Sequence, residues 1–76
     1  MELNEFVAKF AEQFDETEAS VFTPETNFRE IDEWSSLLAL SIIAMADEEY
    51  NVTLKGDDIK NSHTVKDIFE IVNSRI

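Results

Sequence analysis

Hydrophobic residues recur at helical spacing in three stretches of the chain. In residues 2–14 and 65–75 they stand three or four positions apart and form one apolar stripe, with polar residues on the other side. In residues 36–50 the first three turns have almost no polar side, so this helix is either central or exposes an apolar patch that binds something. The first stripe consists of Leu3, Phe6, Val7, Phe10 and Phe14, and the last of Val65, Ile68, Phe69, Val72 and Ile76.

The segments between these helices have weaker patterns. Residues 15–35 show no sustained period and contain Thr23-Pro24, which suits a turn, so we predict a long loop there. In residues 51–62, the step Gly56-Asp57-Asp58 allows a short helix of one or two turns. The apolar residues expected to pin the long loop to the core are Val21, Phe22, Phe28 and Ile31.

Each long helix needs apolar neighbours, so the helices require a common core. We therefore predict an all-α fold: a small four-helix bundle of three main helices and one short third helix, with a long loop between helices 1 and 2. Ser35 or Ser36 can cap the start of the second helix, and Thr64 with Asp67 forms a capping arrangement for the last. A length of 76 residues supports a single domain, residues 1–76.

The net charge narrows the choice of partners. The chain has 17 Asp and Glu against 6 Lys and Arg, a formal net charge of −11. Nucleic acids and anionic membranes are repelled by such a chain, whereas a protein with a basic patch is attracted. No apolar run is long enough to span a membrane, and the acidic N-terminus lacks the basic start of a signal peptide. The cytoplasm is therefore the expected compartment.

Few residues here are suited to catalysis. With no Cys, one Gly and one His, the chain has no thiolate metal site, no Gly-rich phosphate loop and no pair of His ligands. A bundle of this size also leaves little room for a substrate cleft. We therefore predict that the protein is not an enzyme and has no metal site, and we expect a monomer.

The segment Ile31–Leu37 lies where the long loop meets the apolar helix. Ser35 and Ser36 both fall near the first turn, where free backbone N–H groups and the helix dipole favour an anion such as a phosphate ester. Composition alone favours the simpler interpretation, in which Ser35 caps the helix and Ser36 has no role of its own. Trp34 has two interpretations, an anchor of the loop on the core or a part of a partner surface.

Several features then follow one another at a defined spacing. Phe28 is followed eight residues later by Ser36-Leu37, Asp47-Glu48-Glu49-Tyr50 closes the apolar helix, Ile59 lies in the short third helix, and Thr64-Val65-Lys66-Asp67-Ile68 opens the last. In this order and spacing, the chain resembles the acyl carrier protein family over most of its length.

This resemblance implies a carrier module without catalytic activity of its own. In the family, a phosphopantetheinyl transferase esterifies the serine that corresponds to Ser36 with the 4'-phosphopantetheine arm of coenzyme A. The thiol of that arm then carries an acyl chain as a thioester. The implied partners are this transferase and acyl-transferring or synthase enzymes with a basic and apolar docking surface. Fatty-acid, polyketide, lipid-modifying and amino-acid carriers share these motifs.

The chain departs from the family pattern in two places. Ser35 replaces the Asp that precedes the modified serine, and Asp32 and Glu33 are nearby carboxylates that could substitute for it. The positions soon after Ser-Leu, which carry docking acids in the family, hold Leu38 and Ser41 here. We therefore expect a specialised carrier whose partner offers an apolar contact. Its expected partner-binding residues are Trp34, Leu37, Leu38, Ser41, Asp47 and Glu48.

Two further hypotheses are compatible with the residues. The missing Asp suits a carrier-like subunit that is not modified and serves in protein interaction. A small, acidic, helical chain also suits an inhibitor of a basic nuclease, of the immunity-protein kind, although no motif of that class is present.

Overall fold

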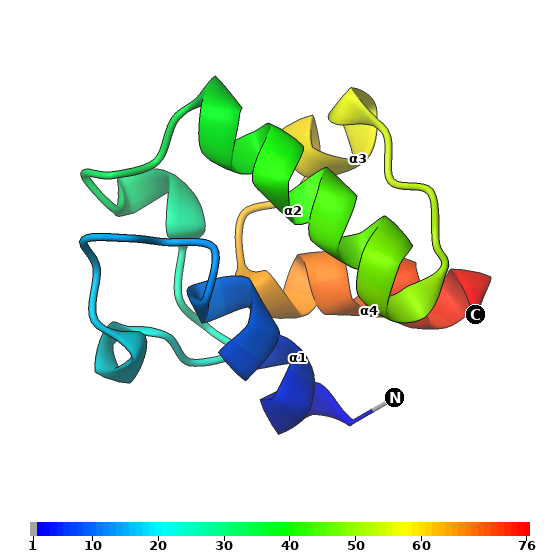
Figure 1. Cartoon of the computed structure of the whole chain (residues 1–76), viewed down its shortest axis with the longest axis horizontal. Helices are drawn as coiled ribbons and strands as arrows, with labels where there is room; N and C mark the ends of the chain where they lie inside the picture. The colour runs from blue at the N-terminus through cyan, green and yellow to red at the C-terminus, as the bar shows by residue number, and fades with distance from the viewer. Residues whose placement is uncertain (1) are drawn as a thin grey trace.

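The computed structural model describes residues 2–76, and its regular structure is entirely helical. The four α-helices are α1 (Leu3–Ala11), α2 (Ser36–Tyr50), α3 (Gly56–Lys60) and α4 (Val65–Arg75). The long segment between α1 and α2 contains two 3-10 turns, η1 (Ala19–Val21) and η2 (Phe28–Glu30) (Figure 1). The predicted all-α fold, with three main helices, a short third helix and a long first connection, is confirmed.

The helices enclose one hydrophobic core. In Figure 1, α2 crosses the front of the molecule and α4 runs below and behind it. α1 packs against both α4 and α2, and α3 packs against α4. Core residues without exposed surface are Phe6, Phe10, Phe28, Ile42, Ala46, Val65, Ile68 and Val72. Within residues 2–76, no helix is both long enough and apolar enough to cross a bilayer.

α1 is shorter than its apolar stripe. The helix ends at Ala11, whereas the sequence predicted a helix as far as Phe14. The N–H groups of Gln13 and Phe14 donate to the carbonyls of Phe10 and Ala11, at 3.2 and 3.0 Å, which is the tighter 3-10 pattern. Phe14 nevertheless keeps its place in the core, at 6% exposure. The stripe therefore predicted the buried face correctly and the end of the helix wrongly.

Two phenylalanines hold the long loop on the core. The ring centroids of Phe22 and Phe28 lie 6.1 and 5.7 Å from that of Phe10, and both side chains are buried. Ile31 packs against the same core and is half-buried. Val21 is 48% exposed, so its predicted role as an anchor is wrong. The loop thus follows a path that buried side chains determine.

Two arginines hold the short helix α3 in place. Arg29 donates from Nε to the carbonyl of Ser62 at 2.8 Å and from Nη2 to that of Ile59 at 2.7 Å. Arg75 binds both carboxylate oxygens of Asp58, at 2.7 and 2.9 Å, and thereby holds the pKa of Asp58 below its ordinary value. A helix of five residues is not stable by itself, so these tertiary contacts decide its position.

Candidate functional site

The start of α2 contains two adjacent serines with different roles. Ser35 is the N-cap: its backbone is extended (φ −158°, ψ 172°), and its Oγ accepts the N–H of Leu38 at 3.4 Å. Its carbonyl accepts the N–H of Ala39 at 3.1 Å. Ser36 is the first residue of the helix and is exposed. The cap is therefore Ser35, and the side chain of Ser36 is not needed to begin the helix.

The hydroxyl of Ser36 has no hydrogen-bond partner within residues 2–76. The backbone N–H groups of Ser36 and Leu37 have no acceptor in that range either, and they stand at the positive end of a helix of 15 residues. A phosphodiester on Ser36 Oγ places its negative charge beside these groups. The first turn of α2 therefore fits a covalently attached phosphate group in both exposure and charge.

Trp34 anchors the turn that leads into Ser36. Its indole packs on Phe28, with ring centroids 4.6 Å apart, and stacks on Phe14 at 6.3 Å. Its backbone N–H donates to the carbonyl of Ile31 at 2.9 Å. Because the indole is half-buried against the core, the interpretation of Trp34 as a loop anchor is confirmed. The exposed remainder of the ring is the part that a partner can reach.

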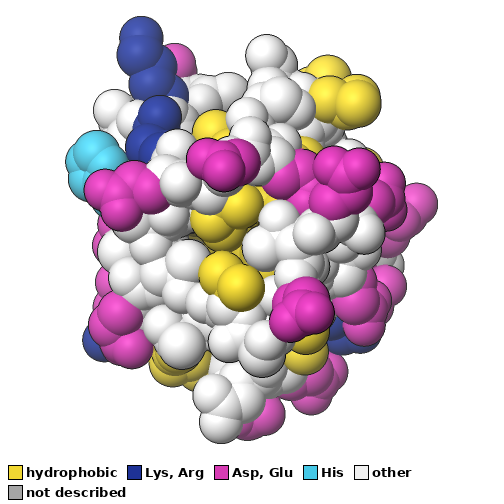
Figure 2. Space-filling view, turned by 90° about the vertical axis from the view of Figure 1, so that its left-hand side faces the viewer, with side chains coloured by type: hydrophobic (Ala, Val, Ile, Leu, Met, Phe, Trp, Pro, Cys, Tyr) yellow, Lys and Arg dark blue, Asp and Glu magenta, His cyan; other side chains and the backbone are white. Residues whose placement is uncertain are grey.

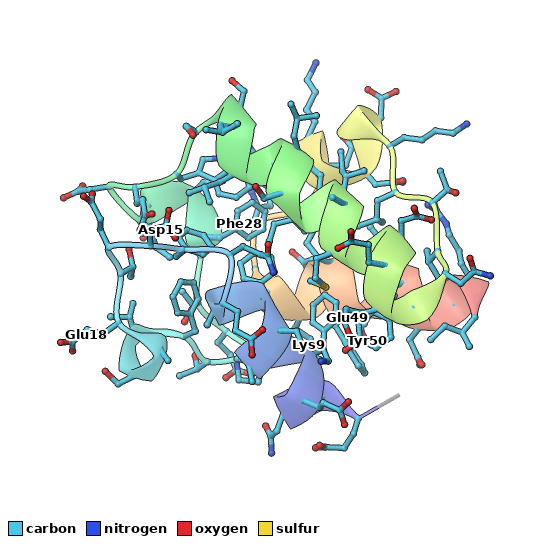
Figure 3. The ribbon with its side chains drawn as sticks, viewed as in Figure 1. Lys9, Asp15, Glu18, Phe28, Glu49 and Tyr50 are labelled. Carbon is cyan, nitrogen blue, oxygen red and sulfur yellow. The ribbon has the colours of Figure 1, made fainter. Side chains whose placement is uncertain are left out.

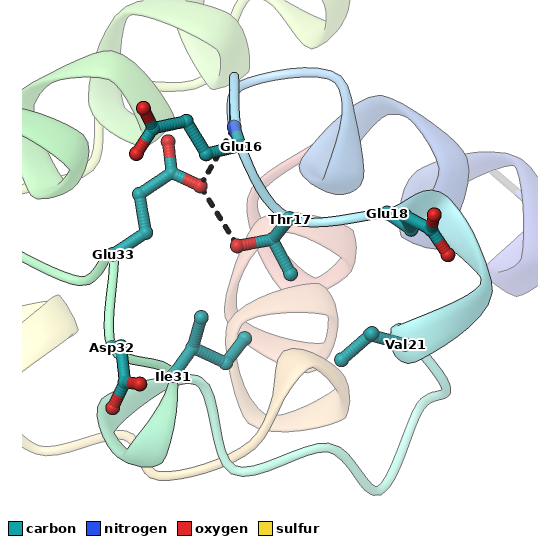
Figure 4. A pocket seen from close by; sticks show the side chains of 7 residues that line it. All are labelled: Glu16, Thr17, Glu18, Val21, Ile31, Asp32 and Glu33. Atoms are coloured by element: carbon teal, nitrogen blue, oxygen red, sulfur yellow. Dashed lines mark hydrogen bonds between the residues drawn. The ribbon is translucent and has the colours of Figure 1, made fainter.

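Glu33 ties this turn to the segment that follows α1. Its carboxylate accepts the backbone N–H groups of Asp15 and Glu16, at 2.8 and 3.1 Å, and the hydroxyl of Thr17 at 2.8 Å (Figure 4). Burial raises the pKa of Glu33, but these hydrogen bonds outweigh it and keep the pKa below its ordinary value. Glu33 is thus engaged within the fold. Two acids were expected to substitute for the missing Asp, namely Asp32 and Glu33. Asp32 is exposed and its side chain forms no hydrogen bond within residues 2–76.

A hollow of about 670 Å³ opens beside Glu33, and Figure 4 shows its walls. Val21 and Ile31 contribute apolar surface to it, and the acids around them come from the two ends of the long loop. The lining residues are Glu16, Thr17, Glu18, Val21, Ile31, Asp32 and Glu33. No group of three or more side chains in residues 2–76 is arranged to hold a metal ion. The hollow is thus an acidic surface feature of the loop that leads to Ser36.

The outward face of α2 is apolar next to Ser36. Leu37 is 72% exposed and Leu40 62% exposed, whereas Leu38 is only 8% exposed. Figure 2 shows hydrophobic side chains at the upper right of this end of the molecule, above a band of Asp and Glu. The expectation that Leu38 offers a contact to partners does not fit its burial, because Leu38 points into the core shared with Ile42 and Met45. Ser41 is half-buried.

The acids at the end of α2 are divided between two faces. Glu49 turns toward α1, where its carboxylate binds the ammonium group of Lys9 at 3.1 Å (Figure 3). Tyr50 lies beside them, with its ring 5.8 Å from that of Phe6. Asp47 and Glu48 are exposed, and their carboxylates form no ion pair within residues 2–76. These two acids are therefore free to bind a cation of another molecule.

A comparison of the sequence with models of known protein families identifies the family of this chain. The family model described as "Phosphopantetheine attachment site" matches residues 3–72, so the chain belongs to this family of phosphopantetheine carriers. Domains of the family bind 4'-phosphopantetheine covalently, so the predicted cofactor is confirmed as the cofactor of the family. The resemblance to acyl carrier proteins is confirmed as well. A search of curated proteins returned no match.

One residue of the exposed face was not among those expected from the sequence. Leu40 stands three residues after Leu37, and Ala44 four residues after Leu40, so these three exposed residues follow a helical row. The spacing was visible in the sequence. However, α2 carries apolar residues on several sides, so spacing alone could not tell the exposed row from the buried ones.

Proposed function

We propose that this protein carries an acyl group, or a related intermediate, as a thioester on a phosphopantetheine arm attached to Ser36. The observation that supports the proposal is the division of roles at the start of α2. Ser35 is used as the cap, whereas the hydroxyl of Ser36 is exposed and unpartnered in the described chain. Family membership supplies the arm, and Ser36 has the accessibility and the electrostatic surroundings that its attachment requires.

The attachment is a transfer from coenzyme A. Ser36 Oγ forms a bond to the phosphorus that bears pantetheine, and the bond from that phosphorus to the bridging oxygen of the pyrophosphate breaks. Adenosine 3',5'-bisphosphate leaves, and the hydroxyl proton of Ser36 passes to a base of the transferase. The chain itself contributes the nucleophile and, through the free N–H groups of Ser36 and Leu37, a favourable position for the phosphodiester. The thiol comes with the arm, so a chain without Cys can carry a thioester.

The proposal is tested by loading the purified protein with a broad-range phosphopantetheinyl transferase and coenzyme A. We expect intact-mass spectrometry to show the addition of one phosphopantetheine. Ser36→Ala should abolish this addition, and the matched variant Ser35→Ala should retain it. Addition to Ser36→Ala would show that another residue is modified. The mass of the protein from its native host then identifies the cargo.

The alternative is a carrier-like subunit that works without the arm. The observation that favours it is Ser35, which stands where the family has Asp. The same experiment separates the two: a folded wild-type protein that several transferases fail to load, and that carries no arm in its host, supports the unmodified subunit.

A further inference from the structure

The turn that leads into Ser36 has few hydrogen bonds to the rest of the chain. Within residues 2–76, the backbone hydrogen bonds of residues 31–35 join groups that are only three or four positions apart. The hydrogen bonds from this turn to a distant segment all end on one side chain, the carboxylate of Glu33. The backbone of the turn therefore does not by itself fix the direction in which the chain enters α2.

Glu33 binds the segment that follows α1 through three donors. Its carboxylate accepts the N–H groups of Asp15 and Glu16, at 2.8 and 3.1 Å, and the hydroxyl of Thr17 at 2.8 Å (Figure 4). Hydrogen bonds to an ionised acceptor are about twice as strong as those between neutral groups. Three such bonds to one carboxylate fix both its position and its orientation.

The next residue holds the same segment on the side of the core. The indole of Trp34 stacks on Phe14, with ring centroids 6.3 Å apart, and Phe14 is the buried residue directly before Asp15. Two adjacent side chains thus attach the turn to residues 14–17, one through an apolar contact and the other through hydrogen bonds. A turn held at two points cannot rotate about either of them.

We infer that Glu33 is a positioning residue for the loading of Ser36. By holding the turn on residues 15–17, it sets the direction in which Ser36 Oγ meets the phosphopantetheinyl transferase. This inference rests on the proposed function. The rate of a group transfer depends steeply on alignment, and a displacement of about 1 Å can lower it a hundredfold. Glu33 acts through the turn and not on the phosphorus, because its carboxylate is occupied by groups of its own chain.

The hydrogen bonds of Glu33 are formed under the conditions of loading. They keep the pKa of Glu33 below its ordinary value, against the effect of burial, so the carboxylate is ionised at neutral pH. An ionised carboxylate can accept from all three donors at once, whereas a protonated one loses acceptor capacity.

The first test compares Glu33→Ala with Glu30→Ala. Glu30 is an exposed acid of the same loop whose side chain has no hydrogen bond in the described residues, so its variant removes the same atoms and the same charge. In loading assays with coenzyme A, we expect kcat to fall about tenfold for Glu33→Ala, with KM changed less than kcat. Glu30→Ala should load like the wild type. A loss of Glu33→Ala that lies in KM alone would indicate a direct contact with the transferase and would overturn the inference.

The second test removes one donor. Thr17→Val replaces the hydroxyl that binds Glu33 with a methyl group, and we expect a smaller loss of kcat, about threefold. In the double variant Glu33→Ala/Thr17→Val, the loss should equal that of Glu33→Ala, because both substitutions act on one interaction. Losses that multiply in the double variant would show that the two residues act separately, and would overturn the inference.

A loss of stability is separated from a loss of positioning with Asp58→Ala. Asp58 binds Arg75 and the N–H of Lys55, so its variant also removes a carboxylate with several partners, but from α3. We expect Asp58→Ala to be less stable in urea and to load like the wild type. Circular dichroism checks that each variant is folded in the assay. A tenfold loss of kcat in Asp58→Ala as well would mean that loading follows stability alone, and would overturn the inference.

The fluorescence of Trp34 reports on the turn without any enzyme, because Trp34 is the only tryptophan of the chain. When Glu33 no longer holds the turn, water reaches more of the indole. We therefore expect Glu33→Ala to shift the emission to longer wavelength and to increase quenching by acrylamide, with Glu30→Ala unchanged. Slower loading of Glu33→Ala with unchanged fluorescence would indicate that the turn has not moved, and would overturn the inference.

The remaining outcomes separate this inference from the proposed function. If the wild type is loaded and Glu33→Ala is loaded at the same rate, the inference fails and the proposed function stands. If no transferase loads the wild type, both fail.

Discussion

The indole of Trp34 packs on the ring of Phe28, with centroids 4.6 Å apart. Phe28 is fully buried in the core, and Trp34 lies two residues before Ser36. Because Phe28 is fixed in the core, its contact with Trp34 also fixes the turn that precedes Ser36. This contact explains why a loop of irregular backbone can hold Ser36, the proposed attachment residue, at a defined position.

Replacing Trp34 with Ala should destabilise the protein. The indole contacts both Phe28 and Phe14, so its loss leaves a cavity beside two core rings. For a half-buried aromatic side chain we expect a decrease of about 2 kcal/mol in the free energy of unfolding. Urea denaturation followed by circular dichroism measures it, because the variant has no tryptophan fluorescence. Trp34→Phe should retain part of the stability, and equal stability of Trp34→Ala and wild type would contradict the anchoring role.

The two serines should separate stability from modification. Ser35→Ala removes the N-cap bond to Leu38, so we expect a cost of about 1 kcal/mol in the free energy of unfolding, with loading retained. Ser36→Ala should leave stability within about 0.5 kcal/mol of wild type, because this exposed hydroxyl supports nothing in the fold. Chemical denaturation measures both. A larger loss of stability for Ser36→Ala than for Ser35→Ala would contradict the assignment of the cap.

The carboxylate of Glu33 should make the protein sensitive to acid. Its pKa is lowered in the folded state, so its stabilising effect is complete above the unfolded pKa, near 4.5, and is lost as the pH falls through the folded value. Glu33→Gln cannot titrate and should therefore lose less stability between pH 7 and pH 3 than the wild type.

Urea midpoints across that pH range provide the measurement. Asp58 and Asp67 also have lowered pKa values and contribute to the acid sensitivity of both proteins. The difference between the wild type and Glu33→Gln therefore isolates Glu33. Parallel curves for the two proteins would show that the hydrogen bonds of Asp15, Glu16 and Thr17 to Glu33 do not depend on its charge.

Arg29→Ala should loosen α3. The guanidinium group binds carbonyls at the end of α3, and its loss leaves Ile59 and Ser62 without these charged donors. We expect a decrease of about 1 kcal/mol in global stability, together with faster amide hydrogen exchange in residues 56–62 than in α4. Arg29→Lys should rescue only part of the protection, because an ammonium group cannot span the same set of carbonyls. Unchanged amide hydrogen exchange in residues 56–62 would contradict the role of Arg29 in holding α3.

Local signals predicted the helix starts well. Thr64 and Asp67 form the expected capping box: Thr64 Oγ accepts the N–H of Asp67, and the carboxylate of Asp67 accepts the N–H of Thr64. The bounds of α2 and α4 agree with the predicted ranges. Such signals are readable because a cap involves residues only three positions apart. The end of α1 was missed because the apolar stripe continues through the turn to Phe14.

The sequence by itself determined where the helices begin and the order of motifs that points to a phosphopantetheine carrier, whereas the structure decided that Ser35, and not Ser36, is the cap of α2. The tertiary structure decided which apolar side of α2 is exposed, since Leu38 and Leu40 differ only in the neighbours that α1, α4 and the loop bring to them. It also decided that Glu33 is bound by residues 16 to 18 positions earlier. Helical periodicity records which positions share a face, whereas burial depends on contacts between segments far apart in the chain.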